Sequence, residues 1–274
     1  MDNAATTPVS PAVLEKMLPY FSECYGNANS IHSTGLDARK ALNAARKKVA
    51  AALNCNPEEV YFTSGGSESD NWALKGVAFA NRKKGNHIIT SAIEHHAILH
   101  TCEWLEKQGF EITYVPVDAD GLVNPADVEA AITDKTILIS IMAANNEIGT
   151  IEPIEEIAKI AHAHHVLFHT DAVQAIGAIP VDVRAIGCDL LSLSGHKFHG
   201  PKGVGALYIK QGTRIDNLIH GGAQERGRRA STENVAGIVG MAEAIELATA
   251  NIPEKAARIS ALRDQLIDGL TALP

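Results

Sequence analysis

Cysteine is scarce in this 274-residue chain, and its four thiols are widely spaced, at Cys24, Cys55, Cys102 and Cys188. No two of them form a CxxC pair, so neither a disulfide framework nor a zinc knuckle is indicated. Cys188 lies within an apolar run and is expected to be buried and inert. The twelve histidines occur partly in groups, but no HExxH or other metal-ligand spacing is present, so no metal site is predicted.

Long apolar runs and an excess of positive charge are also missing. No run of about 18 apolar residues exists, so no membrane span is predicted. The start of the chain has neither a basic region nor an apolar core, so it does not resemble a signal peptide, and we expect a cytoplasmic location. The net charge of -8 and the pI near 5.8 argue against nucleic acid or an anionic membrane as the main partner.

Hydrophobic residues make up 46% of the chain, which is enough for a sizeable core. Short apolar runs predict seven strands, at 60–63, 87–90, 112–117, 137–142, 166–170, 188–193 and 204–209. Helical patterns occur at 10–24, 33–53, 67–83, 95–108, 125–132, 153–165, 230–250 and 253–272. Pro19 is expected to distort or end the first helix. This alternation predicts an α/β fold, with a mostly parallel seven-stranded sheet covered by helices on both faces.

The polar residues that follow the strands are the candidate site residues, because ligands of open α/β sheets bind outside the carboxyl ends of the strands. Ser64-Gly65-Gly66-Ser67 follows the first strand and opens a helix. Glycines allow close backbone approach and a helix N-terminus favours an anion, so this turn suits a phosphate. It is not a Walker A loop, because no GK[ST] follows, and no GxGxxG is present.

Two further strand ends carry candidate ligand contacts. His95, after the second strand, could stack on a flat ligand or move protons, although an ordinary histidine at a helix N-terminus has equal odds from the sequence alone. Asn145 and Asn146, after the fourth strand, could orient a hydroxyl or a carboxylate. Neither signal is specific by itself.

The fifth and sixth strands end in charged residues. Asp171 follows a buried strand, where a carboxylate needs a cationic partner. The sixth strand leads to Ser194, His196 and Lys197. A lysine in this position can lose its proton and attack a carbonyl, although most loop lysines simply face water. A phosphate cradle, a stacking imidazole, a buried carboxylate and an amine nucleophile together match pyridoxal 5'-phosphate (PLP).

The chain resembles the cysteine desulfurases of the NifS/IscS group, which belong to class V of the fold-type I PLP enzymes. The resemblance extends from residue 2 to residue 274. The motifs that carry it are Asp2 to Pro8, Gly26 to His32, Thr63 to Ser69, Glu94-His95-His96, Asn145 to Gly149, His169 to Gln174, Ser194 to Gly205, and Gly221 to Asn234. It implies the large domain of a fold-type I PLP transferase over residues 1–250. Residues 251–274 would then be the first helix of a small C-terminal domain that is largely missing.

The resemblance implies a role for each candidate residue. Lys197 would bind PLP covalently and later move the substrate's α-proton, His95 would stack on the ring and assist acid–base steps, and Asp171 would pair with the ring nitrogen. Asn146 and Gln174 would contact the ring's phenolic oxygen or the substrate. The phosphate would lie against four residues, Gly66, Ser67, Ser194 and His196. Thr232 would reach the phosphate bound in the other subunit of a homodimer.

Two departures from the family pattern qualify the resemblance. The family usually has Gly-Thr-Glu-Asn where this chain has Ala230-Ser231-Thr232-Glu233-Asn234, so a serine replaces a glycine. The Ser/Gly-rich loop with the sulfur-accepting cysteine is absent, and none of the four cysteines lies in such a motif.

The expected activity is cysteine desulfuration. The substrate L-cysteine would give L-alanine and an enzyme persulfide, which a sulfur-acceptor or scaffold protein would use for iron–sulfur cluster or related assembly. Two alternatives remain open. The chain could be another class V PLP enzyme, such as a selenocysteine lyase or an aminotransferase, or a PLP-binding fragment without turnover.

Overall fold

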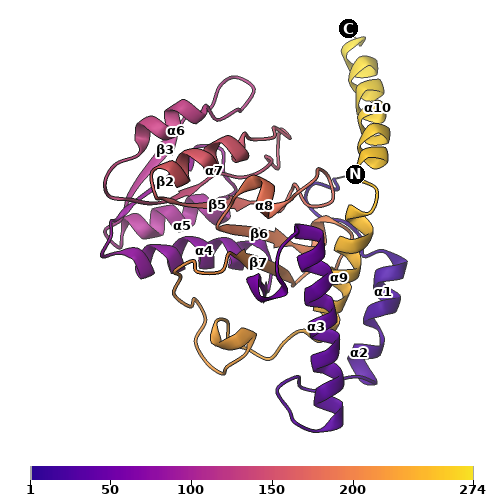
Figure 1. Ribbon diagram of the computed structural model, residues 1–274. Coiled ribbons are helices and arrows are strands. Elements are labelled where there is room, and N and C mark those ends of the chain that lie inside the picture. The colour runs from indigo at the N-terminus through magenta and orange to yellow at the C-terminus, as the bar shows by residue number, and fades with distance from the viewer. Residues whose placement is uncertain (1, 274) are drawn as a thin grey trace.

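The computed structural model describes residues 2–273 and contains one seven-stranded sheet (Figure 1). Its strands are β1 (Val60–Thr63), β2 (His87–Ser91), β3 (Glu111–Val115), β4 (Thr136–Ser140), β5 (Leu167–Asp171), β6 (Leu190–Ser194) and β7 (Gly205–Ile209). They lie in the order β1-β7-β6-β5-β4-β2-β3. Strand β7 is antiparallel to both of its neighbours and the other pairs are parallel. The predicted mostly parallel sheet is confirmed.

Helices cover both faces of the sheet, as expected when β-strands alternate with helices. The helices are α1 (Pro11–Met17), α2 (Pro19–Ser22), α3 (Ser33–Leu53), α4 (Gly66–Asn81), α5 (His96–Glu106), α6 (Pro125–Ala131), α7 (Ile154–Ala163), α8 (Val183–Ile186), α9 (Val235–Thr249) and α10 (Ile252–Thr271). Helices α4 and α5 share one apolar cluster with the sheet, whereas α3, α7 and α9 share the other. Side chains of β1 alternate accordingly, with Tyr61 in the first cluster and Phe62 in the second.

Two predicted helices differ from the structure. The helix predicted over 10–24 is interrupted at Leu18, because Pro19 cannot continue the hydrogen-bond ladder and instead starts α2. The helix predicted over 230–250 begins only at Val235, where the side chain of Asn234 accepts a hydrogen bond from the Gly237 N–H and caps it. The short α8, between the Asp182 cap and left-handed Gly187, was not predicted.

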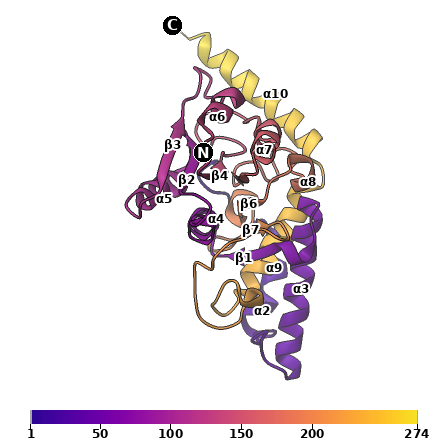
Figure 2. The same ribbon diagram turned by 60° about the vertical axis from the view of Figure 1, so that its left-hand side comes forward.

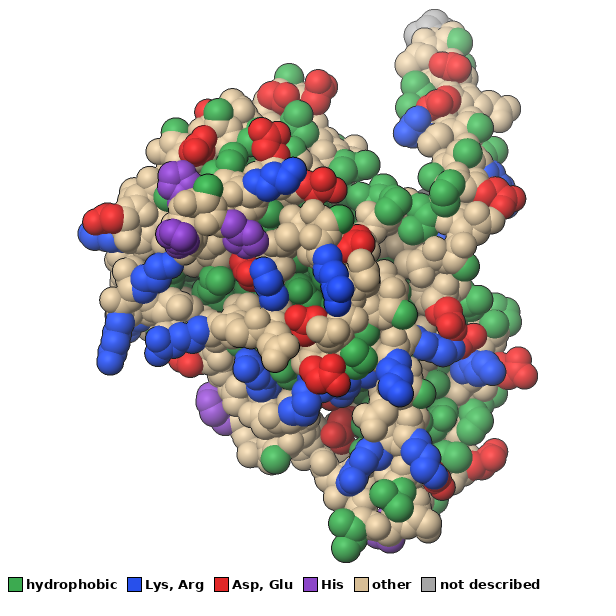
Figure 3. Space-filling model, in the orientation of Figure 1, with side chains coloured by type: hydrophobic (Ala, Val, Ile, Leu, Met, Phe, Trp, Pro, Cys, Tyr) green, Lys and Arg blue, Asp and Glu red, His purple; other side chains and the backbone are tan. Residues whose placement is uncertain are grey.

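Helix α10 projects away from the rest of the structure (Figures 1 and 2). Ile252 at its start is its one buried residue among those described. The other large apolar side chains of α10 therefore face outward, and apolar side chains are visible on the projecting part of the molecule in Figure 3. The exposed ones are Ile259, Leu262, Leu266, Ile267 and Leu270. This geometry is compatible with the predicted boundary between residues 1–250 and 251–274, which remains a prediction.

No single described helix is long and apolar enough to cross a bilayer. Helices α9 and α10 reach that length and composition only as a pair, and a bend of 74° separates them.

Candidate functional site

A cavity of about 280 Å³ opens where the carboxyl ends of β4, β5 and β6 meet the start of α4. Every residue to which the family resemblance assigns a role, except Thr232, lines it. The lining residues are Ala5, Gly66, Ser67, Asp70, His95, Met142, Ala144, Asn146, Asp171, Val173, Gln174, Ser194, His196 and Lys197. The structure therefore brings predicted residues that are up to about 130 positions apart along the chain to one cavity.

The start of α4 forms a turn in this cavity that is suited to an anion. Gly65 precedes the helix at φ 152°, a conformation that favours glycine, and no side chain caps the helix there. The first N–H groups of α4 consequently remain available to a ligand, and the positive end of the helix dipole favours an anion. Space is also restricted: a Cβ on Gly66 would lie 2.8 Å from Cγ2 of Val173. The turn thus brings backbone, rather than side chains, to the ligand.

Asp171 provides a negative charge at the cavity floor. It ends β5 and is only 5% exposed, and one carboxylate oxygen accepts a hydrogen bond from the Val173 N–H at 2.9 Å. Burial raises its pKa to about 6, although the Val173 N–H and the charge of Lys197 oppose the shift. A cationic group placed in the cavity would stabilise the ionised form.

Lys197 follows β6 and projects into the same cavity, where the N-terminal segment contacts it. Its Nζ donates hydrogen bonds to the carbonyl oxygens of Ala4 and Ala5. Burial lowers the pKa of Lys197, and the charges of Asp171, Asp2 and Glu147 partly offset this effect. A lowered pKa increases the fraction of neutral amine, which is the nucleophilic form.

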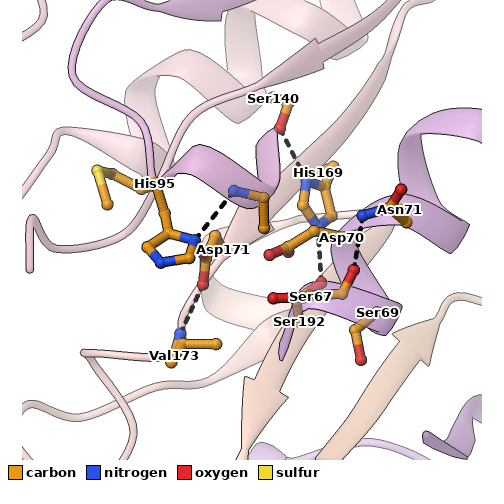
Figure 4. Close-up of polar contacts among 12 residues, drawn as sticks. Ser67, Ser69, Asp70, Asn71, His95, Ser140, His169, Asp171, Val173 and Ser192 are labelled. Carbon is orange, nitrogen blue, oxygen red and sulfur yellow. Dashed lines mark hydrogen bonds and ion pairs between the residues drawn. The ribbon is translucent and has the colours of Figure 1, made fainter. Parts of the chain in front are cut away.

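Two imidazoles border the cavity. His95 caps α5, and its Nδ1 accepts the Ala97 N–H at 3.1 Å (Figure 4). Burial and the neighbouring His96 and Lys197 lower the pKa of His95. Burial likewise lowers the pKa of His196, whose Nδ1 lies 3.1 Å from the hydroxyl of Thr6. Both rings are therefore uncharged near neutral pH and can stack on a ligand or accept a proton.

The two predicted amides are also at the cavity wall. Gln174 donates a hydrogen bond to the Ala4 carbonyl at 3.1 Å, and Asn146 donates one to the Glu147 carboxylate at 2.9 Å. Asn145, which also follows β4, has a different function. It donates to the Ile93 carbonyl and accepts the N–H groups of Glu147 and Ile148, so it holds the loop in place.

Sequence reasoning missed two buried carboxyl groups. Asp70 lies one turn into α4, lines the cavity and is 1% exposed. Glu94, the residue before His95, accepts hydrogen bonds from the Ser91 hydroxyl and the Met142 N–H. These two hydrogen bonds join the end of β2 to the end of β4. Burial raises the pKa of Glu94 to about 8. An acidic residue within the apolar face of α4 was the available signal for Asp70.

Thr232 is the exception among the predicted residues. It lies in a second cavity of about 170 Å³ together with Ser64, Arg229 and Ser231. Ser231 has φ 118°, in the region that favours glycine, so the serine that replaces the family's glycine has an unfavourable backbone conformation. Its N–H donates a hydrogen bond to the Gln224 side chain at 3.2 Å.

No cysteine side chain lines the main cavity among the described residues. Cys102 and Cys188 are buried, which confirms the expected burial of Cys188, and Cys24 and Cys55 are half-buried. Burial raises the pKa of Cys55 and of Cys102 to about 12. These thiols are therefore neutral and poorly nucleophilic near neutral pH.

The cavity fits PLP. The uncapped α4 N-terminus and the close approach at Gly66 suit a phosphate, and the buried Asp171 suits a protonated ring nitrogen. Lys197 supplies an amine for the aldehyde, and His95 supplies a flat ring at the wall. The cavity itself contains no metal-ligand cluster, and no group of three or more His, Cys, Asp and Glu side chains suited to a metal occurs among residues 2–273.

Comparisons with known proteins agree with these features. The family model described as aminotransferase class-V matches residues 1–274. A cysteine desulfurase IscS from Methanosarcina thermophila is 63% identical over 274 residues, which is 100% of this chain and 68% of that protein. A solved NifS-like protein superposes with a TM-score of 0.97 at 48% identity, covering 98% of this chain and 74% of that one. A structure of SspA in complex with cysteine gives a TM-score of 0.87 at 45% identity, covering 89% and 71%.

Proposed function

Since this chain belongs to the class V aminotransferase family, and within it to the PLP-dependent cysteine desulfurases, we propose that it binds PLP in the cavity beside Lys197 and acts there on L-cysteine. One observation carries the proposal. Segments distant in the sequence bring the α4 N-terminus, the buried Asp171, His95 and Lys197 to a single cavity. This set matches the chemical groups of the cofactor one by one.

When bound, PLP supplies an aldehyde that takes up an amine and a ring that withdraws electrons from the substrate's α-carbon. In this chain Nζ of Lys197 would be the amine that holds the cofactor, and it would also be the base that takes the substrate's α-proton. The Asp171 carboxylate pairs with the ring nitrogen and keeps it protonated. His95 packs on the ring and, being uncharged, accepts or returns a proton.

The remaining predicted residues orient the ligand. The N–H groups at Gly66 and Ser67, with the side chains of Ser194 and His196, bind the phosphate. Asn146 and Gln174 hydrogen-bond the phenolic oxygen or the substrate, after Gln174 releases the Ala4 carbonyl.

Sulfur transfer needs a thiol beside the substrate sulfur, and none of the four cysteines lies in the cavity. We therefore propose that residues 1–274 bind the cofactor and L-cysteine but do not themselves accept the sulfur. The complete reaction would give L-alanine and a persulfide, which a sulfur-acceptor or scaffold protein would use for iron–sulfur cluster or related assembly.

A homodimer is part of the proposal. Thr232 lies outside the cavity of its own chain, so it is free to reach a phosphate bound in a second subunit. A cytoplasmic location is likewise proposed.

The test of cofactor binding is the visible absorbance of the protein after incubation with PLP and removal of the excess. Wild-type protein is expected to keep a visible band, and Lys197→Ala is expected to lose it because no other lysine lines the cavity. Lys83→Ala, which changes an exposed lysine just beyond the C-terminal end of α4, is the matched control and should keep the band. A wild-type protein that folds but stays colourless would contradict the proposal.

A further inference from the structure

A second layer of polar side chains lies directly beneath the cavity. Met142, Asp171 and Ser194 line the cavity, and the residues two positions before them are polar and fully buried. These three residues are Ser140, His169 and Ser192, one from each of the adjacent strands β4, β5 and β6. Since side chains two apart on a strand share a face, this layer faces α4. Asp70 extends from α4 toward it (Figure 4).

Hydrogen bonds join the three strands through the His169 ring. Its Nδ1 lies 2.8 Å from the Ser140 hydroxyl, and its Nε2 lies 3.0 Å from the Ser192 hydroxyl. Both ring nitrogens are thus engaged. Oδ1 of Asp70 lies 3.8 Å from Nε2, beyond hydrogen-bond distance, and is buried without a hydrogen-bond partner.

The surroundings of Asp70 disfavour a negative charge. Strands β4 and β6 present only the Ser140 and Ser192 hydroxyls, and β5 presents His169 and Asp171. Glu94, before α5, adds a second carboxyl group. Lys197 lines the same cavity as Asp171, and its charge lowers the pKa of Asp171. Among the described residues, no ion pair within 4 Å joins Lys197 to Asp70. A buried carboxylate with so few donors is costly, whereas a neutral carboxylic acid is not.

We propose that Asp70 is a positioning residue that keeps its proton, so that the two carboxyl groups on the cavity floor carry one negative charge and Asp171 carries it. The inference rests on the proposed function, because the single charge matters through the ring nitrogen that Asp171 pairs with. Burial and the charges of Asp171 and Glu94 raise the pKa of Asp70 well above its ordinary value, although the Ser192 hydroxyl opposes the shift. Burial lowers the pKa of His169 to about 3, so the ring between the serines is a neutral imidazole.

The first test uses the protein without cofactor. A carboxyl group whose pKa is raised by folding binds its proton more tightly in the native state, so stability falls as pH rises above the unfolded-state pKa. Asp70→Asn should remove this loss of stability at high pH, because an amide has nearly the shape of a protonated carboxyl group but does not ionise. We expect its Tm to match wild type near pH 4 and to exceed it by about 4 °C or more at pH 8. Asp134→Asn, an exposed control, should follow wild type at both pH values.

A lower Tm for Asp70→Asn than for wild type at pH 8, or failure of that variant to fold, would overturn the proposal. Either result would mean that Asp70 is ionised and paired with a protonated His169, because the substitution would then leave a buried charge unpaired. The Tm comparison does not require PLP. It therefore tests the protonation of Asp70 even if the proposed cofactor does not bind.

The second test separates a positioning role from simple packing. Asp70→Ala leaves space and removes the polar group beside Asp171, whereas Asp70→Asn restores a neutral hydrogen-bonding group. We expect Asp70→Asn to retain PLP, measured by visible absorbance after dialysis, at least about tenfold more tightly than Asp70→Ala. If both variants lost PLP to the same extent relative to wild type, the site would need the carboxylate, and the proposal would be overturned.

Discussion

Asp171 is the residue whose ionisation decides whether the cavity can hold a protonated ring nitrogen. Burial places its pKa at about 6, so protonation removes the anion as pH falls through that value. We expect PLP loading of the cofactor-free protein to weaken as pH is lowered from 8 to 5. We expect Asp171→Asn to weaken loading by about tenfold or more at pH 8, and the difference from wild type to shrink toward pH 5, where the wild-type carboxyl is itself protonated. Visible absorbance after dialysis measures both effects.

The control for this prediction is Asp127→Asn, which changes an exposed carboxylate on α6. It should load PLP with the pH dependence of wild type. Loading that is independent of pH between 5 and 8 in the wild-type protein would contradict the assignment of Asp171.

Ser231 is a second residue with a specific expected effect. Its φ is 118°, a backbone conformation that is higher in free energy for a residue with a Cβ than for glycine. The side chain of Ser231 is exposed. We expect Ser231→Gly to raise the free energy of unfolding by about 1 kcal/mol. Urea denaturation measures the change. Ser231→Ala keeps the Cβ and should show no gain, so an equal gain in both variants would mean that the backbone is not the cause.

Residues at strand ends were predictable because each follows a recognisable apolar run. Asp171 and Lys197 were found in this way, and the structure places both in one cavity. Asp70 and Glu94 were not found, because their significance depends on which strands lie under α4 and beside β2. That information is tertiary. The acidic residue within the apolar face of α4 was a local signal for Asp70, but it does not indicate which strands lie beneath the helix.

At the level of elements, the strands and long helices followed from periodicity, whereas the segment between β7 and α9 did not. Its backbone has positive φ at Glu225 and Arg226, which local sequence preferences disfavour. Side-chain contacts with distant elements hold it instead. Arg229 forms a bidentate ion pair with Glu68 of α4, with distances of 2.7 and 2.9 Å. The segment that carries Thr232 is thereby fixed to the start of α4, where we propose that the phosphate binds.

A second, buried pair fastens the same segment to α3. Arg46 donates two hydrogen bonds to Glu225, which also accepts the Phe62 N–H of β1 at 2.9 Å. Removing the guanidinium would leave the Glu225 carboxylate buried without its cation. We expect Arg46→Ala to lower the free energy of unfolding by about 3–5 kcal/mol, measured by urea denaturation.

The neighbouring Lys47→Ala is the control for that substitution, because Lys47 is exposed and lies on the same helix. Lys47→Ala should change the free energy of unfolding by no more than about 0.5 kcal/mol. If Arg46→Ala changes the free energy of unfolding as little as Lys47→Ala does, water reaches Glu225 and the pair is not buried in solution.

At the level of the whole molecule, the expected result is cofactor binding without efficient sulfur transfer. Purified residues 1–274, loaded with PLP, should form little or no alanine and sulfide from L-cysteine, because no thiol lies in the cavity. The cysteine desulfurase IscS of Methanosarcina thermophila, assayed in parallel, is a suitable positive control. Robust turnover by this chain would assign the sulfur-accepting role to one of its four cysteines, which single Cys→Ala variants would then identify.

The sheet order also constrains how the protein is made. Strand β1 lies at one edge, and its partner in the sheet is β7, which is synthesised about 140 residues later. Until β7 leaves the ribosome, β1 has no strand to pair with, and the turn that follows it has no fixed position. Lys197 also lies between β6 and β7 in the sequence, so it is synthesised shortly before β7. Cofactor capture by the nascent chain must therefore wait until nearly the whole sheet has been translated, and the unpaired apolar β1 is exposed to aggregation during that interval.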